Sequence, residues 1–251
     1  MADRSARVAF ITGAAAGFGR AFAQGLAEDG AAVAIADVDR AGAERAAGEL
    51  GADGHRALAL VCDVADEQSV AAAVGRTVAT FGGVDVLINN AGLHLSKYNQ
   101  PFGVLPRDEL RALLEVNVVG VVNCALACLP SMRQRGGGTI VNIASIAAHS
   151  VQSPYGVSKL AVRGLTQALA AEFAPDRIRV NAISPGLVAT ENALADLPQS
   201  LRQDFVDNRQ LIHRPGEVGD IVSAMMWLCS DAASFVTGET LKVSGGYPLG
   251  I

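Results

Sequence analysis

The sequence alternates short apolar runs with longer amphipathic segments along almost its whole length. The apolar runs predict strands at residues 7–12, 32–36, 57–61, 84–88, 138–144, 178–183 and 240–243. Helical patterns lie between them, at residues 18–29, 41–50, 67–81, 107–133, 154–173 and 217–229. Strands that are apolar on both faces and separated by helices predict an α/β fold with a parallel sheet between two helical layers. Right-handed crossovers then favour a doubly wound, Rossmann-type sheet, a three-layer α/β/α arrangement.

The chain is expected to form a single domain. Its 251 residues are 50% hydrophobic and 18% charged, which allows a large core and excludes dominant disorder. No linker, charge block or internal repeat divides residues 1–251. The one long stretch without a strand, residues 187–215, is richer in polar residues and is predicted to be a lid over the substrate.

Charge and cysteine content exclude several classes of function. Twenty Lys and Arg against twenty-five Asp and Glu give a net charge of −5, without the basic face that binds nucleic acid. The most apolar helical stretch, residues 118–130, is shorter than the roughly 20 residues of a membrane span. The N-terminal apolar run is too short for a signal peptide. The cysteines form no C-x-x-C pair and Cys124 and Cys128 have no nearby histidine, so we expect reduced thiols, no metal site and a cytoplasmic protein.

A glycine-rich turn follows the first strand, with the sequence TGAAAGFG at residues 12–19. Gly13 permits a tight turn, Gly17 lets the backbone approach a pyrophosphate, and Gly19 permits close packing of helix on strand. The helix that begins there offers N–H groups and a positive dipole end to phosphate. Within this chain-long β/α alternation, the turn predicts nucleotide binding.

The charged residue after the second predicted strand indicates whether the nucleotide is NAD or NADP. Asp37 can accept hydrogen bonds from both ribose hydroxyls and would repel a 2′-phosphate. Arg40 could instead favour that phosphate, although Asp37 is nearer the strand end. The sequence therefore predicts NAD rather than NADP.

Tyr155 and Lys159 are four residues apart on a predicted helix and so share one face. Ser153 and Pro154 have the pattern of an N-cap followed by proline in the first turn, which places Tyr155 at the helix start. A nearby ammonium and a helix N-terminus are expected to lower the pKa of Tyr155 from about 10 toward working pH. Such a phenol could act as a general acid or base.

Ordered motifs along almost the whole chain resemble those of the short-chain dehydrogenase/reductase family, in its compact branch. They are T-G-x-x-x-G-x-G at 12–19, Cys62-Asp63-Val64, Asn89-Asn90-Ala91-Gly92, Asn117, Ser145, Tyr155-x-x-x-Lys159, Asn181 and Pro185-Gly186. The resemblance implies an oxidoreductase that transfers hydride between a secondary alcohol, or its ketone, and a nicotinamide cofactor. Ala16 stands where NADP-preferring relatives often carry a basic residue, which again favours NAD.

The resemblance also assigns catalytic roles. Tyr155 would exchange the hydroxyl proton of the substrate and Ser145 would hydrogen-bond the substrate oxygen. Lys159 would lower the pKa of Tyr155 and bind the nicotinamide ribose, and Asn117 would hold a water that links Lys159 to solvent.

The implied cofactor contacts lie at the ends of successive strands. Besides Tyr155 and Lys159 they are Gly13, Gly17, Phe18, Gly19, Asp37, Asp63, Val64, Asn89, Ala91, Gly92, Pro185, Gly186, Val188 and Thr190. The last four would hold the nicotinamide carboxamide. Asn90 is expected to tie neighbouring strands together rather than to touch the ligand.

Ser145 and Tyr155 are closer together in this sequence than in most of the family. Ser145 still closes the fifth strand in the family's pattern, and Ser150 and Ser153 are alternatives to it. The segment 93–106, with His94, Tyr98 and Phe102, is longer than usual and is predicted to form part of the substrate wall. His94 and His149 are interpreted as exposed loop residues, with substrate contact as the alternative.

Substrate and assembly are less constrained. The lid mixes apolar and charged residues, which suggests a medium-sized, partly apolar alcohol or ketone. Alternatives are an NADPH-dependent carbonyl reductase and a nucleotide-sensing regulator without chemistry. By resemblance, we expect a homotetramer formed through residues 118–129 and 160–171, although packing within the chain would explain the same apolar faces.

Overall fold

A seven-stranded parallel sheet forms the centre of the molecule, in the order β3-β2-β1-β4-β5-β6-β7. The computed structural model describes residues 7–94, 96–189 and 198–249. The strands are β1 (Val8–Thr12), β2 (Ala32–Asp37), β3 (Ala57–Val61), β4 (Val86–Asn89), β5 (Gly138–Ile143), β6 (Ile178–Pro185) and β7 (Thr240–Val243). The order reverses after β1, as in a doubly wound sheet, so the predicted fold class is confirmed.

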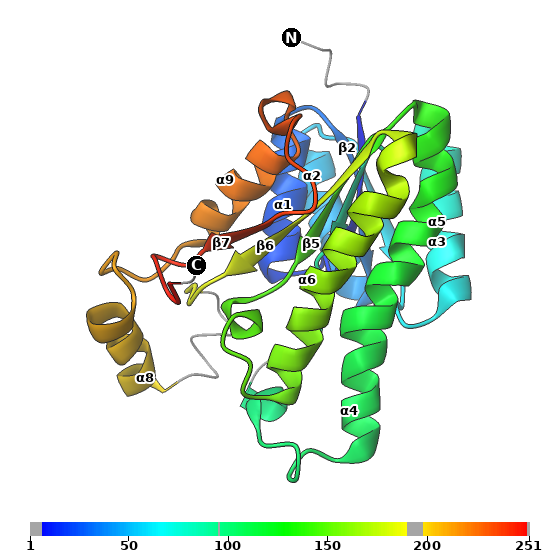
Figure 1. Cartoon of the computed structure of the whole chain (residues 1–251). Helices are drawn as coiled ribbons and strands as arrows, with labels where there is room; N and C mark the ends of the chain where they lie inside the picture. The colour runs from blue at the N-terminus through cyan, green and yellow to red at the C-terminus, as the bar shows by residue number, and fades with distance from the viewer. Residues whose placement is uncertain (1–6, 95, 190–197, 250–251) are drawn as a thin grey trace.

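Helices cover both faces of this sheet (Figure 1). They are α1 (Gly17–Glu28), α2 (Arg40–Ala52), α3 (Glu67–Phe81), α4 (Arg107–Leu114), α5 (Gly120–Arg135), α6 (Pro154–Phe173), α8 (Gln199–Asp204) and α9 (Val218–Leu228). Helices α1, α2 and α9 pack on one face, and α3, α5 and α6 on the other (Figure 1). The expected bounds of these elements either match the observed ones or differ from them by no more than two residues.

Alternate residues of each strand supply the two cores. In β1, Phe10 faces the α3, α5 and α6 side, whereas Ala9 and Ile11 face the α1, α2 and α9 side. All three side chains are fully buried. Burial on both faces explains why the strands read as continuous apolar runs, and one sheet with two helical layers makes a single α/β domain.

One helix is longer than its most apolar stretch suggested. Helices α4 and α5 are joined without a break by a π-helical turn, Glu115–Val119. The continuous helix Arg107–Arg135 is long and apolar enough, by length and composition alone, to span a membrane, so the expectation that its most apolar stretch is confined to residues 118–130 was wrong. Its residues Cys124, Cys128 and Met132 are fully buried in the core against the sheet. The helix is therefore a core helix of the α/β domain.

Candidate active site

The glycine-rich turn between β1 and α1 is closely packed on its inner side. Gly13 has a φ of 62°, and a Cβ atom there would lie 2.8 Å from the Cα of Ala91. A Cβ atom on Gly19 would overlap the carbonyl oxygen of Gly13. Asn90 donates from Nδ2 to the carbonyl oxygens of Thr12 and Gly13, at 2.9 Å each. The predicted structural role of Asn90 is confirmed.

The outer side of the same turn is open. Gly17 has a φ of 55°, and a Cβ atom there would meet no described atom within 4 Å. Helix α1 has Ala16 at its N-cap, so its first-turn amides receive no side-chain cap. Phe18 stacks on Phe22, with ring centroids 6.1 Å apart. Open space beside uncapped amides fits the phosphates of a dinucleotide.

Asp37 lies beside this turn at the end of β2. Its Oδ2 accepts a hydrogen bond from the Ala15 amide at 2.9 Å, and its Oδ1 accepts one from the Asp39 amide at 3.0 Å. Arg40 is exposed at the start of α2, with Nη1 3.8 Å from the Glu44 carboxylate. The carboxylate of Asp37 is therefore fixed where a ribose would follow the phosphates.

The predicted adenosine-side residues follow β3 and β4. Asp63 is exposed and accepts at Oδ1 from the Ala65 amide at 3.0 Å, and Val64 is buried beside it. Asn89 donates from Nδ2 to Oδ1 of Asn142 at 2.9 Å, which ties β4 to β5. Contact of these residues with a cofactor stays a prediction, and the amide of Asn89 already has a structural partner.

Helix α6 begins as its sequence predicts. Ser153 caps it by accepting from the Gly156 amide at 3.2 Å, and Pro154 occupies its first turn. Ser153 also donates to Oδ1 of Asn99 at 2.9 Å. Tyr155 and Lys159 share a face, with Nζ 5.9 Å from the centroid of the phenol ring. Because Ser153 serves as the cap, it is a poor alternative to Ser145.

Ser145 lies two residues beyond the end of β5 and meets Tyr155 through a hydrogen bond between their side chains. Its Oγ also accepts from the Ala147 amide at 3.1 Å and so caps a short 3-10 helix, Ile146–Ala148. Ser150 is exposed on the loop beyond. The structure thus brings together Ser145, Tyr155 and Lys159.

The pKa values at this group differ from the expectation. Burial raises the pKa of Tyr155, and the hydrogen bond with Ser145 offsets this only in part. The predicted lowering of the Tyr155 pKa is therefore wrong for this structure, because desolvation of the phenolate outweighs the helix terminus. Lys159 is 5% exposed and donates from Nζ to the carbonyl oxygen of Ile143 at 2.8 Å. Its burial lowers its pKa to about 8.

Asn117 lies in the π-helical turn of the long helix and is fully buried. Its Nδ2 donates to the Leu93 carbonyl at 2.9 Å and to Oγ of Ser158 at 3.0 Å, and its Oδ1 accepts from the Leu93 amide at 2.7 Å. A Cβ atom on Gly92 would lie 3.3 Å from Nζ of Lys159. The side-chain amide of Asn117 is engaged in holding the Leu93 backbone close to Lys159. A water bound by Asn117 would therefore have to contact a different atom of that residue.

The residues expected at the nicotinamide carboxamide follow β6. Pro185 ends the strand, and a Cβ atom on Gly186 would lie 2.6 Å from the Cα of Ser244. Val188 forms an isolated parallel bridge with Gly216. Thr190 lies outside the described residues. The close approach at Gly186 explains why glycine follows proline here.

Comparisons with known proteins identify the family. A family model described as enoyl-(acyl carrier protein) reductase matches residues 13–248. Cis-4-hydroxycyclohexanecarboxylate dehydrogenase of Sinomonas cyclohexanicum is 43% identical over 96% of each chain. Dehydrogenase/reductase SDR family member 4 of Oryctolagus cuniculus is 36% identical over 96% of this chain and 94% of its own. The chain belongs to the short-chain dehydrogenase/reductase family.

A solved structure agrees with this assignment. The 7α-hydroxysteroid dehydrogenase complexed with NADH and 7-oxo glycochenodeoxycholic acid matches with a TM-score of 0.90 and 33% identity over 98% of each chain. The predicted family and fold are both confirmed, and the protein is an oxidoreductase of this family.

The segment after β4 packs against Tyr155 of this dehydrogenase/reductase. Tyr98, Leu105 and Leu113 form a buried apolar cluster, and Tyr155 lies against it. The hydroxyl of Tyr98 donates to Oε2 of Glu109 at 3.1 Å, and Lys97 pairs with the same carboxylate at 2.7 Å. His94 and Phe102 are exposed. Of the two aromatic residues in the predicted wall, Tyr98 therefore belongs to the cluster that packs with Tyr155, whereas Phe102 does not.

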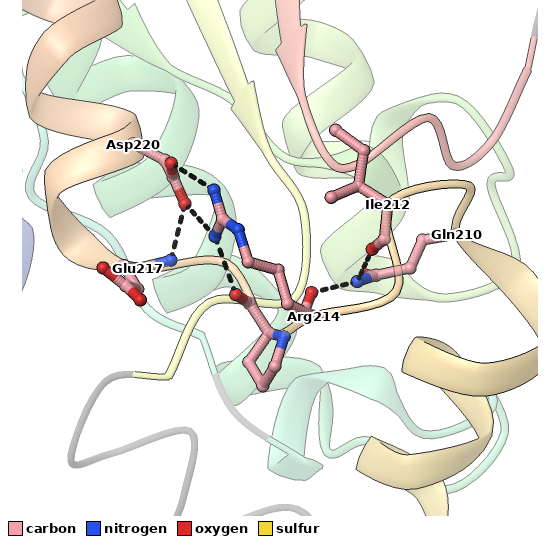
Figure 2. A network of polar contacts seen from close by, with 6 residues as sticks. Gln210, Ile212, Arg214, Glu217 and Asp220 are labelled. Carbon is pink, nitrogen blue, oxygen red and sulfur yellow. Dashed lines mark hydrogen bonds and ion pairs between the residues drawn. The ribbon is translucent and has the colours of Figure 1, made fainter.

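The described part of the lid is anchored by polar contacts that sequence reasoning missed (Figure 2). Arg214 makes two hydrogen bonds of 2.8 Å to the carboxylate of Asp220, which also accepts from the Glu217 amide at 2.8 Å. Gln210 is buried and donates to the carbonyls of Ile212 and Arg214. An acidic residue three positions after Glu217 is a capping-box spacing, which could have indicated the Asp220 contact.

His149 differs from its interpretation as an exposed loop residue. Its side chain is half-buried, and Nε2 lies 3.1 Å from Oγ of Ser184, a fully buried residue of β6. The interpretation is wrong because the shortened loop folds back on the sheet instead of projecting from it.

Proposed function

We propose that this protein is an NAD-dependent dehydrogenase that transfers hydride between a secondary alcohol, or its ketone, and nicotinamide, with Tyr155 as the general acid or base. The observation that carries the proposal is the hydrogen-bonded pair Ser145 and Tyr155, with Lys159 one helical turn away. Relatives support the CH–OH chemistry, since they include a hydroxycyclohexanecarboxylate dehydrogenase and a hydroxysteroid dehydrogenase. A nucleotide-sensing regulator that catalyses no reaction would not need these three residues together.

When bound, the nicotinamide cofactor supplies the site that accepts or releases hydride. In oxidation, the alcohol C–H bond breaks with both of its electrons, and the hydroxyl proton passes to Tyr155. In reduction, Tyr155 returns that proton to the ketone oxygen. Ser145 donates a hydrogen bond to the same oxygen and stabilises the charge that develops there.

Lys159 supports the proton exchange electrostatically. With a pKa of about 8, its ammonium is largely protonated at neutral pH although it is buried. A positive charge close to the phenol favours the phenolate, which opposes the effect of burial on the Tyr155 pKa. Lys159 also lies within reach of Gly92, where a ribose hydroxyl would approach.

The cofactor of this proposal is NAD rather than NADP. Asp37 is held against the glycine-rich turn, where its charge would repel a 2′-phosphate. We expect kcat/KM to be at least tenfold higher with NAD, and Asp37→Ser to reduce that ratio. Asp53→Ser, at the other end of α2, is the matched control and should leave the ratio unchanged. A preference of the wild-type protein for NADP would establish the carbonyl-reductase alternative instead.

The substrate class is a medium-sized, partly apolar secondary alcohol. Tyr98 and the leucines packed with it place apolar surface beside Tyr155. A panel of acyclic, cyclic and sugar alcohols, followed through NADH formation, tests the proposal directly. Turnover of cyclic or branched apolar alcohols supports it. Failure of every alcohol with NAD⁺ and of every ketone with NADH contradicts it.

The proposal extends to assembly and location: a cytoplasmic homotetramer with no nucleic-acid or membrane partner. Leu126 on α5 and Leu160 on α6 are 48% and 44% exposed, on the two helices expected at subunit contacts. Burial between subunits would remove this apolar surface from water. Light scattering after size exclusion should give the mass of four chains, and a monomer would contradict the tetramer.

A further inference from the structure

His149 connects two segments whose relative position matters for the proposed reaction: the turn that follows Ser145 and the carboxyl end of β6. It ends the 3-10 helix that Ser145 begins, and its amide donates to the Ile146 carbonyl at 2.9 Å. The Ala148 amide donates to the Ser145 carbonyl at 3.0 Å. This single turn therefore makes His149 a rigid extension of the backbone that positions the Ser145 hydroxyl.

The other end of the connection is on β6. Nε2 of His149 lies 3.1 Å from Oγ of Ser184, which directly precedes Pro185 and Gly186. Ser184 is fully buried and its backbone pairs with Lys242 of β7, so it moves only with the sheet. The imidazole thus ties the substrate-oxygen side of the site to the strand end assigned to the nicotinamide carboxamide.

The groups around the imidazole keep it uncharged. Burial holds the pKa of His149 below its usual 6.5, and the positive charges of Arg163 on α6 and Lys242 on β7 lower it further. Arg163 also donates from Nη1 to the Ala148 carbonyl at 3.0 Å, next to His149. A neutral imidazole can share a hydrogen bond with the Ser184 hydroxyl without adding a third positive charge.

We propose that His149 is a positioning residue of the dehydrogenase reaction, which fixes the distance between Ser145 and the nicotinamide-binding end of β6. The inference rests on the proposed function and adds a residue that touches neither substrate nor cofactor. Hydride transfer needs donor and acceptor carbons at close approach, and a small displacement of the oxygen-binding group reduces the rate steeply.

Paired substitutions test the hydrogen bond. His149→Leu should lower kcat/KM for ketone reduction about tenfold, with the dissociation constant of NADH changed less than twofold. His149→Gln can place an amide nitrogen near Nε2 and should retain activity within about threefold of wild type. Ser184→Ala should reproduce the loss, and the double variant His149→Leu, Ser184→Ala should be no worse than either single one. Losses that multiply, or no rescue by glutamine, would overturn the proposal.

The pH profile of reduction adds a readout that a purely structural role would not change. In that direction Tyr155 acts as the acid and stays protonated at low pH, so its own titration does not lower the rate. Because the pKa of His149 is lowered, protonation of its imidazole beside Arg163 and Lys242 should reduce kcat/KM only on the acidic side of the usual imidazole pKa, and His149→Gln should abolish that fall. A fall that persists in the glutamine variant contradicts the proposal.

Controls separate this inference from the proposed function. His55→Leu, in the loop before β3, should leave kcat/KM unchanged and gives the background effect of replacing a histidine. Amide hydrogen exchange of residues 145–149 should quicken in His149→Leu whether or not the protein turns over an alcohol. Unchanged exchange there contradicts the positioning role, whereas a wild-type protein that binds NADH but reduces no ketone contradicts only the proposed function.

Discussion

The glycine-rich turn after β1 and the predicted substrate wall after β4 take their shapes from different features of the chain. At the turn, main-chain conformation and the lack of side chains at Gly13 and Gly19 determine the geometry. At the predicted wall, side-chain contacts determine the geometry: Lys97 and Tyr98, in the 3-10 turn Ser96–Asn99, bind Glu109 on α4. A turn specified by its backbone tolerates little substitution, whereas a wall specified by side chains can change its substrate without changing its fold.

Tyr155→Phe should have the largest effect, because it removes the hydroxyl group that the proposed reaction between cofactor and substrate requires. Loss of the acid or base should lower kcat by about 10² to 10⁴, while NADH binds as in the wild-type protein. Steady-state rates and NADH fluorescence give the two quantities. Near-normal turnover would show that another group exchanges the proton.

Gly19→Ala tests the claim that the turn is specified by its backbone. Its Cβ atom would meet the Gly13 carbonyl and Nδ2 of Asn90, so we expect a loss of about 1–3 kcal/mol in the free energy of unfolding. Gly48→Ala is the control: it is exposed on α2 with open space around it, and it should stabilise the protein by roughly 0.5–1 kcal/mol. Urea denaturation of both variants decides the point, and equal stabilities would refute the packing argument.

The pH dependence of oxidation should follow the phenol of Tyr155. Because burial raises its pKa, the phenolate that accepts the proton is scarce at neutral pH and increases about tenfold for each unit of pH. We therefore expect kcat/KM for alcohol oxidation to rise across the neutral and alkaline range. A profile that is already flat at neutral pH would mean that the Tyr155 pKa is low in the working enzyme.

Tyr98→Phe should have the smallest effect and act on the wall alone. It removes the hydrogen bond to Glu109, which is worth roughly 1 kcal/mol, and keeps the apolar packing against Tyr155. We expect the KM for the alcohol to rise a few-fold and the KM for NAD to stay unchanged. An equal change in both would show that the wall and the nucleotide site are not independent.

Sequence reasoning succeeded where function depends on local pattern. The glycine-rich turn, the structural role of Asn90, and the cap of α6 by Ser153 each involve a short motif whose geometry is nearly independent of its surroundings. The doubly wound, three-layer class of the fold followed from the alternation of elements. These features could be placed before any contact was known.

The rest depends on contacts between distant parts of the chain. Burial around Tyr155 raises its pKa, and a motif does not show how deeply a phenol is buried. The contact of His149 with Ser184 joins the loop after β5 to a residue of β6 that is 35 positions away, so the local sequence around His149 carried no sign of it. Gln210 is a different case, because its partners are the nearby carbonyl groups of Ile212 and Arg214, which its side chain meets only after this loop turns back on itself.

The central place of β1 in the sheet has a consequence for synthesis of the chain. Ala9 of β1 pairs with Val33 on one side and with Val86 on the other. During translation, β1 and β2 can therefore associate early, but the opposite edge of β1 stays unpaired until the ribosome has released β4. That edge is apolar on both faces and could pair with another nascent chain. Aggregation of the newly made protein should therefore depend on how fast the segment between β2 and β4 is translated.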